Sequence, residues 1–231
     1  MSGESGHRVL DHLGLQAREY DRVIRTYIPA YDDMVATVVR WLDGHLPAGG
    51  LVVDLGTGTG ALSVAILDAL PQARVQLVDI DPEMLEVARG RVGHQASRAE
   101  LRLAAFADPL SPCDAVVASL ALHHVASLGE KRALYRRIHD ALRPGGVLLV
   151  ADVAVHEEGP ERHRIFAEWS ASMQTHGITA AEAEVHFAQW AGEDRYFPLV
   201  AELGALAAAG FPRPECFWRH GPSTVFGGFR D

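Results

Sequence analysis

The sequence predicts an α/β fold in which a mostly parallel sheet is covered by helices on both faces. Short apolar segments alternate with segments of helical periodicity over residues 51–155, which is typical of parallel strands joined by crossover helices. A glycine-rich turn follows the first apolar segment. After Val153 the alternation stops, and the last residues read as two strands joined at Gly221-Pro222.

Composition limits the class of protein. The 231 residues suit one domain, 1–231, and 48% hydrophobic residues support a full core. A formal net charge of −9 argues against a nucleic-acid partner, which would require a basic face. The two cysteines form no C-x-x-C pattern, the first residues lack the order of a signal peptide, and the most apolar run, GVLLVADVAV, is too short to span a bilayer. We therefore expect a cytoplasmic protein without a membrane or nucleic-acid partner.

The elements follow in order along the chain. Residues 7–46 read as helical, because apolar residues of YDDMVATVVRWLDGHL recur at helical spacing. The expected strands of the core, 51–155, are LVVDL, VQLVDID, LRLAAF, DAVVASL and VLLVADV, and the expected helices between them are GALSVAILDAL, PEMLEVARGRV and GEKRALYRRIHDAL. Residues 156–195 look helical, and 196–231 hold a final helix and the hairpin.

The turn in VVDLGTGTG predicts a ligand site. Gly56, Gly58 and Gly60 stand on alternate positions where a strand must bend into a helix, and glycine permits both the bend and close approach of a ligand to the backbone. Gly56, Gly58 and Ala61 also satisfy a dinucleotide-binding pattern. Asp79 ends the second strand, where its carboxylate can accept hydrogen bonds from ribose hydroxyls. These residues therefore predict a nucleoside-containing ligand, but they do not distinguish one such ligand from another.

Four segments together resemble one family. VVDLGTGTG, VQLVDIDPEMLEVAR, CDAVVASLALHHV and LRPGGVLLVADV are similar, in order and spacing, to the signature segments of class I S-adenosylmethionine-dependent methyltransferases. The resemblance implies a Rossmann-like sheet of seven strands, with an antiparallel strand in the last pair, and S-adenosylmethionine as cofactor. It also implies that 1–46 form a helical lid and that 156–195 form a helical insertion over the active site.

The resemblance implies roles for individual residues. Asp54 and the turn Gly56-Thr57-Gly58 would hold the amino-acid end of the cofactor. Asp79 would bind the ribose hydroxyls, and Ile80 would pack on the adenine. Ser119 and Leu120 would border the sulfonium and the acceptor. Many relatives carry Gly-Asp after the third strand, but this chain has Ala104-Ala105, so the adenine contacts are expected from the backbone of Ala105 and Phe106. The run IPAYDDM resembles VPGY of carboxy-S-adenosylmethionine synthases, and we expect Tyr20 or Tyr31 to close over the methionine end.

His123 and His124 are the candidate catalytic residues, because they follow the fourth strand, where the acceptor site of the family lies. A histidine there could take the proton of an oxygen or nitrogen nucleophile. The alternative is that one histidine packs or caps the next helix while the other faces solvent. The spacing of the remaining histidines matches no metal motif, so no metal is expected.

The leading hypothesis is in-line methyl transfer to a small-molecule acceptor, which mainly requires alignment and desolvation of the reactants. An alternative keeps the cofactor and changes the reaction, for example cyclisation to azetidine-2-carboxylate or transfer of another group. A nicotinamide oxidoreductase is a third hypothesis, although Lys131 is the sole lysine and no Tyr-x-x-x-Lys is present. A non-catalytic binding protein is the fourth. The N-terminal helices could also pair two copies into a homodimer.

Overall fold

The computed structural model describes residues 17–231, with side chains from residue 22 onward. The part of the predicted lid before residue 17 lies outside the described residues. Within the described part, no helix has the length and apolar character needed to cross a membrane.

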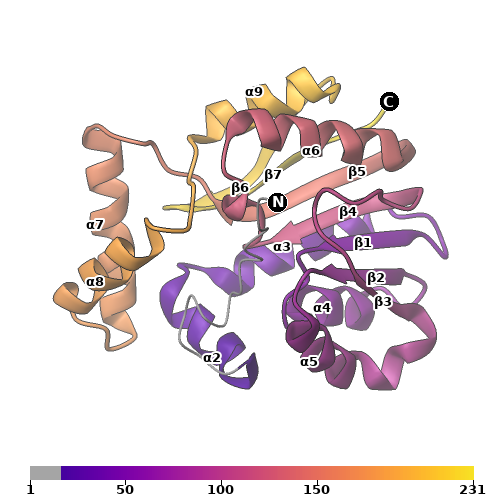
Figure 1. Ribbon diagram of the computed structural model, residues 1–231, viewed down its shortest axis with the longest axis horizontal. Coiled ribbons are helices and arrows are strands. Elements are labelled where there is room, and N and C mark those ends of the chain that lie inside the picture. The colour runs from indigo at the N-terminus through magenta and orange to yellow at the C-terminus, as the bar shows by residue number, and fades with distance from the viewer. Residues whose placement is uncertain (1–16) are drawn as a thin grey trace, which may run out of the picture.

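A seven-stranded sheet forms the centre of the molecule, in the order β3-β2-β1-β4-β5-β7-β6 (Figure 1). The strands are β1 (Leu51–Leu55), β2 (Arg74–Asp79), β3 (Ala99–Leu103), β4 (Cys113–Ser119), β5 (Leu142–Val153), β6 (Glu215–His220) and β7 (Ser223–Phe229). β1 to β5 pair in parallel, whereas β7 is antiparallel to both β5 and β6. The predicted α/β fold, with its closing antiparallel hairpin, is confirmed.

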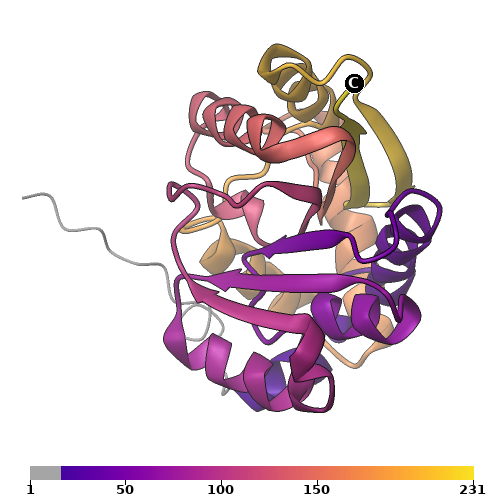
Figure 2. The ribbon, with the colours of Figure 1, turned by 90° about the vertical axis from the view of Figure 1, so that its right-hand side faces the viewer.

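Helices cover both faces of the sheet, as the end-on view shows (Figure 2). The helices are α2 (Ala17–Tyr27), α3 (Tyr31–Asp43), α4 (Ala61–Ala69), α5 (Pro82–Val92), α6 (Leu128–Ala141), α7 (Pro160–Thr175), α8 (Ala180–Trp190) and α9 (Leu199–Ala209). Neighbouring residues of β1 serve opposite faces, as the strand pleat requires. Val52 packs in the cluster that includes α3 and α4, and Val53 packs in the cluster that includes α6 and α9.

The largest differences from the sequence expectation are at three boundaries. β5 begins at Leu142, five residues before the expected strand VLLVADV. β3 ends at Leu103 rather than running through LRLAAF. Ala104 N–H makes the last hydrogen bond between the strands, to the carbonyl of Asp79 where β2 ends, and Ala105 N–H donates to Asp108 within the loop. The helix predicted from RYFPLVAELGALAAAGF begins only at Leu199, after Pro198. The cap of α5 agrees with expectation, since Asp81 accepts a hydrogen bond from Glu83 N–H and Pro82 is the first helical residue.

α7 and α8 form a projection beside the sheet (Figure 1). Its buried centre is aromatic: Trp169 is fully buried, lies 5.7 Å from Trp190 between ring centroids, and donates its indole N–H to the carbonyl of Tyr27. This hydrogen bond ties the insertion to α2, so the first described helix and the projection are packed together.

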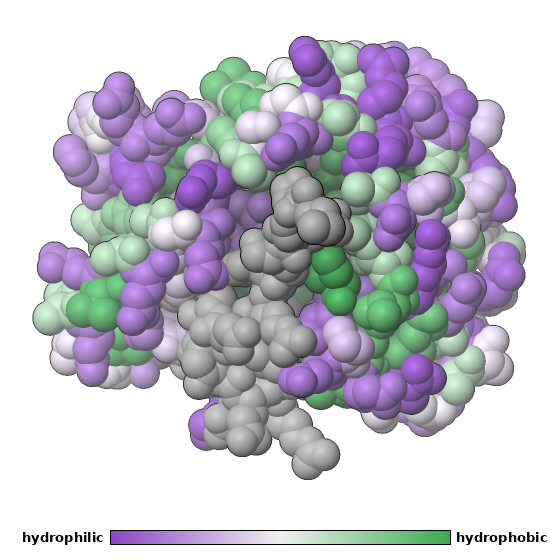
Figure 3. Space-filling model, viewed as in Figure 1, coloured by the Kyte–Doolittle hydropathy of each residue, from purple (hydrophilic) through white to green (hydrophobic). Residues whose placement is uncertain are grey.

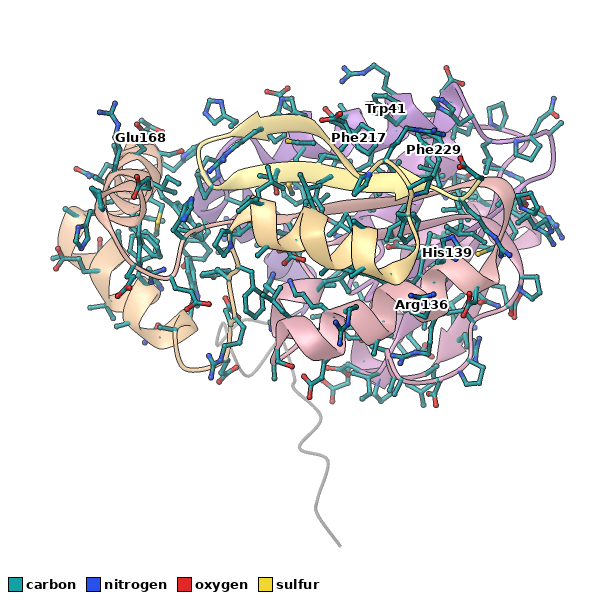
Figure 4. All side chains as sticks on the ribbon, turned by 90° about the horizontal axis from the view of Figure 1, so that it is seen from above. Trp41, Arg136, His139, Glu168, Phe217 and Phe229 are labelled. Atoms are coloured by element: carbon teal, nitrogen blue, oxygen red, sulfur yellow. The ribbon has the colours of Figure 1, made fainter. Side chains whose placement is uncertain are left out.

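At the edge of the sheet formed by β6, the β6–β7 hairpin packs on α3. Trp41 of α3 lies 4.3 Å from Phe217 of β6 and 6.3 Å from Phe229 of β7, between ring centroids (Figure 4). These contacts fix the last strands against the N-terminal half of the chain.

The strand order reverses between β1 and β4. Ligands of open α/β sheets bind outside the carboxyl ends of the strands at such a switch point.

Candidate active site

A cavity of about 730 Å³ lies at the carboxyl ends of β1, β2 and β4. It brings together most of the residues singled out in the sequence. Those lining it are Tyr31, Asp54, Gly56, Thr57, Gly58, Asp79, Ile80, Ala105, Phe106, Ser119, Leu120 and His124. His123 is not among its lining residues. The side chain of Tyr20 lies outside the described residues.

Asp54 is fully buried near the end of β1. Its Oδ2 accepts hydrogen bonds from Thr57 Oγ1 at 2.7 Å and from Ser63 Oγ at 2.6 Å. Its Oδ1 is buried and accepts no hydrogen bond from the part of the chain that the structure describes. Burial raises the pKa of this carboxyl to about 6, against the opposing effect of the two hydroxyl donors. An oxygen of this kind is suited to a positively charged donor such as an ammonium group.

The glycine turn has the conformation that the sequence predicts. Gly56 has φ +75° and Gly58 has φ +53°, in the left-handed region that favours glycine. A Cβ on Gly56 would lie 2.6 Å from Ala121 Cβ, so packing leaves no room for a side chain at this position. A Cβ on Gly58 would meet no described atom within 4 Å. The requirement at Gly58 therefore comes from its backbone angle and from the cavity that it lines.

Asp79 ends β2 beside this turn. Its Oδ2 accepts from Gly58 N–H at 2.7 Å and its Oδ1 accepts from Asp81 N–H at 2.9 Å. Burial raises its pKa in spite of these donors. Because an ionised carboxylate offers about four acceptor positions, Asp79 retains capacity for two hydroxyl groups while the backbone holds it in place.

Apolar surface lies next to Asp79. Ile80 is 48% exposed and Leu103, at the end of β3, is 62% exposed. Hydrophobic residues gather over this part of the molecule (Figure 3). In the following loop, Asp108 accepts from Ala105 N–H at 2.8 Å, and Arg137 donates to the carbonyl of Phe106. Asp108 follows the Ala104-Ala105 pair that stands where many relatives carry Gly-Asp, and its hydrogen bond stabilises the loop around Ala105.

The end of β4 forms another wall. Ser119 Oγ is buried and makes no hydrogen bond with a described residue. Leu120 adopts φ +49°, an uncommon conformation for a residue with a side chain. Its N–H donates to the carbonyl of Ala151, so pairing with β5 holds it there. Such backbone strain is found at functional sites when the surroundings fix it.

His123 lies behind this wall, on the short 3₁₀ turn Leu122–His124. Its Nδ1 is 2.6 Å from Asp152 Oδ1, and its Nε2 is 3.8 Å from Asp194 Oδ1. Burial opposes protonation of this imidazole, but the carboxylates of Asp152 and Asp194 outweigh burial and raise its pKa. The ring of His123 is thus held between two buried carboxylates, one facing each ring nitrogen.

Asp152 is itself rigidly held. Its Oδ2 accepts from the N–H groups of Leu122 and His123, and its Oδ1 accepts from Val153 N–H. Burial would raise its pKa, but His123 and the other donors lower it. Sequence reasoning missed Asp152, although a carboxylate inside the apolar strand VLLVADV is a signal, because a buried charge requires a partner.

His124 faces the cavity, and its Nδ1 lies 3.4 Å from Asp194 Oδ1. Asp194 follows α8 and accepts a hydrogen bond from Tyr196 Oη at 2.5 Å on Oδ2. Burial would raise the pKa of Asp194, but the two histidines and Tyr196 hold it well below its usual range. Nothing in the sequence distinguishes Asp194 from other acidic residues of its segment, because it is the fold that brings it to the histidines.

Comparisons with known proteins indicate the kind of protein to which this chain is similar. A family model described as "Methyltransferase domain" matches residues 53–148. An uncharacterized methyltransferase of Geobacillus kaustophilus is 28% identical over 161 residues, covering 69% of this chain and 74% of that protein. A carboxy-S-adenosyl-L-methionine synthase of Chromohalobacter salexigens is 25% identical over 209 residues, covering 86% and 75%. A ribosomal protein L11 methyltransferase of Aeromonas salmonicida is 32% identical over 136 residues, but this chain spans only 44% of its length.

Among solved structures, the apo form of the S-adenosylmethionine-dependent methyltransferase SibL superposes with a TM-score of 0.64. It is 21% identical, and the match covers 96% of this chain and 71% of that one. At this identity the likeness shows the shared fold. The methyltransferase-domain model over residues 53–148 and the methyltransferase relatives, together with this fold, support an S-adenosylmethionine-dependent methyltransferase and are consistent with class I, a family whose cofactor is S-adenosylmethionine.

Proposed function

We propose that the protein transfers the methyl group of S-adenosylmethionine to a small-molecule acceptor. The observation that carries the proposal is that a single cavity contains the buried Asp54 carboxylate, the Asp79 carboxylate and the His124 imidazole. The first two match the ammonium and the ribose of the cofactor, and the third supplies a group that can interact with a nucleophile. The acidic chain, with net charge −9, also suits a metabolite better than a nucleic acid.

The residues fit the cofactor by their chemistry. The buried Oδ1 of Asp54 would accept from the ammonium group, the glycine turn would face the carboxylate end, and Asp79 would accept from the ribose hydroxyls. Ile80 offers an apolar face for the adenine, bordered by Ala105 and Phe106. When bound, the cofactor supplies a methyl group on a positively charged sulfur.

The protein's own contribution would be alignment and proton removal. Ser119, Leu120 and His124 border the acceptor region, where His124 would contact the nucleophilic oxygen or nitrogen. Tyr31, at the start of α3, closes another side of the same cavity. We propose that the helices of 1–46 and the insertion 156–195 act as covers that exclude water, since desolvation strengthens electrostatic interactions in the site.

The test separates binding from transfer. Isothermal titration should show one molecule of S-adenosylmethionine, or of its demethylated product S-adenosylhomocysteine, bound per chain. Incubation with methyl-labelled cofactor and fractionated small-molecule extracts should then move the label to a metabolite. Absence of cofactor binding at millimolar concentration would contradict the proposal.

A second candidate function is non-methylating use of the cofactor, either cyclisation to azetidine-2-carboxylate or transfer of another group. It is favoured by the match to a carboxy-S-adenosyl-L-methionine synthase, which extends over 86% of this chain. Incubation with S-adenosylmethionine and no acceptor distinguishes the two. Release of methylthioadenosine supports cyclisation, whereas a cofactor that stays intact until an acceptor is added supports methyl transfer.

The nicotinamide interpretation finds no support in the site. Lys131 is buried, ion-paired with Glu202, and is not among the residues that line the cavity. Tyr135, four residues further on, donates to the other oxygen of Glu202. Both side chains serve the packing of α6 against α9.

A further inference from the structure

We propose that His123, His124 and Asp194 form a binding site for a divalent transition-metal ion. No metal motif is visible along the chain, because Asp194 follows His123 by 71 positions and His124 by 70. The proposal concerns the binding of the ion. Only the use of the ion in catalysis rests on the proposed function.

The geometry of the donor atoms is the first argument. One nitrogen from each histidine and one oxygen of Asp194 lie within 4.8 Å of one another. Asp194 Oδ1 is 3.8 Å from His123 Nε2 and 3.4 Å from His124 Nδ1. In a tetrahedral site with bonds of about 2.0–2.2 Å, the ligand atoms are roughly 3.3–3.6 Å apart. The two pairs that include Asp194 are therefore close to the spacing of such a site, and the donor atoms that lie farther apart, within 4.8 Å, would move closer together around an ion.

The surroundings of these side chains are the second argument. Ligand histidines in proteins characteristically place their other ring nitrogen against a carboxylate, which fixes the tautomer and the ring orientation. Asp152 stands in this position behind His123, at 2.6 Å, and is itself held by the N–H groups of Leu122, His123 and Val153. Tyr196 donates to the Oδ2 of Asp194, on the side away from the histidines. Asp152 thus holds the orientation of the His123 ring, and Tyr196 holds the orientation of the Asp194 carboxylate.

The donor set indicates the kind of ion and its use. Two imidazoles and one carboxylate suit Zn²⁺, Fe²⁺ or Mn²⁺ better than Ca²⁺, which prefers oxygen ligands. Three protein ligands leave room for water or substrate, as in catalytic sites. Since His124 lines the cavity, an acceptor hydroxyl could bind the ion, release its proton to water and remain as a bound oxyanion. The substrate class that follows is an alcohol or a phenol.

The test uses the full chain without an affinity tag, freed of metals by a chelator and titrated with Co²⁺. We expect one saturable ion with visible d–d absorption, displaced by Zn²⁺. His124→Ala and Asp194→Ala should each weaken Co²⁺ binding by more than the roughly 10–100-fold that loss of a supporting partner causes. Asp152→Asn should weaken it within that range. The matched control is His163→Ala, an exposed histidine on α7, which should leave Co²⁺ binding unchanged.

Binding of S-adenosylhomocysteine provides the fold check for each variant and separates this inference from the proposed function. If the wild type binds S-adenosylhomocysteine but takes up no saturable Co²⁺, the metal site is wrong and the proposed function stands. The same conclusion follows if folded His124→Ala and Asp194→Ala variants bind Co²⁺ as the wild type does. Saturable Co²⁺ without any cofactor binding would leave the metal site standing and overturn the proposed function.

Discussion

At Asp54, burial raises the pKa of a carboxyl from 3.8 to about 6. Because the native pKa exceeds the unfolded one, the native protein holds the proton more tightly between about pH 4 and pH 6. The free energy of unfolding therefore falls as the pH rises through this window. Above pH 6 the ionised carboxylate costs on the order of 3 kcal/mol, from about 1.4 kcal/mol per pKa unit. A bound ammonium group would offset this cost.

Asp54→Asn removes the buried charge and should raise the melting temperature of the cofactor-free protein at pH 8, with little change at pH 4. The same variant should bind S-adenosylmethionine at least about tenfold more weakly, since a charge-assisted hydrogen bond contributes about 1.5–3 kcal/mol. Scanning fluorimetry across pH and isothermal titration measure the two effects. The exposed Asp43→Asn serves as control. A variant with wild-type affinity would refute the assigned role of Asp54.

Gly58 and Gly49 form a matched pair for testing ligand approach. Both have positive φ, +53° and +73°, and at both a Cβ would meet no described atom within 4 Å. Alanine should therefore cost either site about 1–2 kcal/mol of stability through the backbone alone. Only Gly58 lines the cavity, so Gly58→Ala should also weaken S-adenosylhomocysteine binding by more than tenfold, whereas Gly49→Ala should not. Equal affinities in the two variants would place the cofactor elsewhere.

Between helices, α6 and α9 are joined by a buried ionic group. Lys131 of α6 pairs with Glu202 of α9, and both side chains are almost fully buried. Tyr135 donates to the second carboxylate oxygen of Glu202 at 2.7 Å. Lys131 stands in a helix that reads as charged and exposed, but α9 packs over that helix and encloses the amine. Removal of one partner from such a pair leaves an uncompensated buried charge, which is strongly destabilising.

Glu202→Leu should destabilise the fold by about 3–5 kcal/mol, because it leaves the Lys131 ammonium buried without its partner. The double variant Lys131→Met/Glu202→Leu should recover part of that loss. Urea unfolding of the four proteins in the cycle measures the coupling. Glu168→Gln, which breaks the exposed pair of Glu168 with Arg164 on α7, should cost less than about 1 kcal/mol (Figure 4). If the changes in the free energy of unfolding caused by the Lys131 and Glu202 substitutions simply added in the double variant, the prediction would be wrong.

For the whole molecule, the alternation of apolar and helical segments was enough to predict the sheet. Each strand in LVVDL, VQLVDID and DAVVASL is largely buried on both faces, so its sequence is mostly apolar and easily recognised. β3 was predicted too long because Ala104-Ala105-Phe106 is as apolar as a strand. There, the partner strand β2 ends at Asp79 and the Ala105 N–H donates to Asp108 within the loop, and such contacts are not encoded in local periodicity.

The same reasoning applies to the site. Local motifs located Asp54, the glycines and Asp79, because these residues act where a strand ends and their spacing is fixed. His123 and His124 were located as a pair, but the sequence could not show that only His124 lines the cavity. That distinction depends on Asp152 and Asp194, which β5 and the segment after α8 bring in from distant parts of the chain.

Hydrogen exchange tests the arrangement as a whole. With S-adenosylhomocysteine present, protection should increase in the loops that close the cavity, around Gly56–Gly60, Ile80, Ala105 and Leu120, because a ligand that binds only the native state suppresses local opening. The β6–β7 hairpin, at the far margin of the sheet, should change little. Protection confined to the hairpin would contradict the assigned site. The homodimer stays a prediction, and light scattering of the purified chain checks it.

The burial of Lys131 has a practical consequence, because this chain has no other lysine. In the native protein, acylating dyes and amine cross-linkers should leave this ε-amino group intact. Unfolding would expose it. The number of labels per molecule, read by mass spectrometry, would then count how often the α6–α9 contact opens.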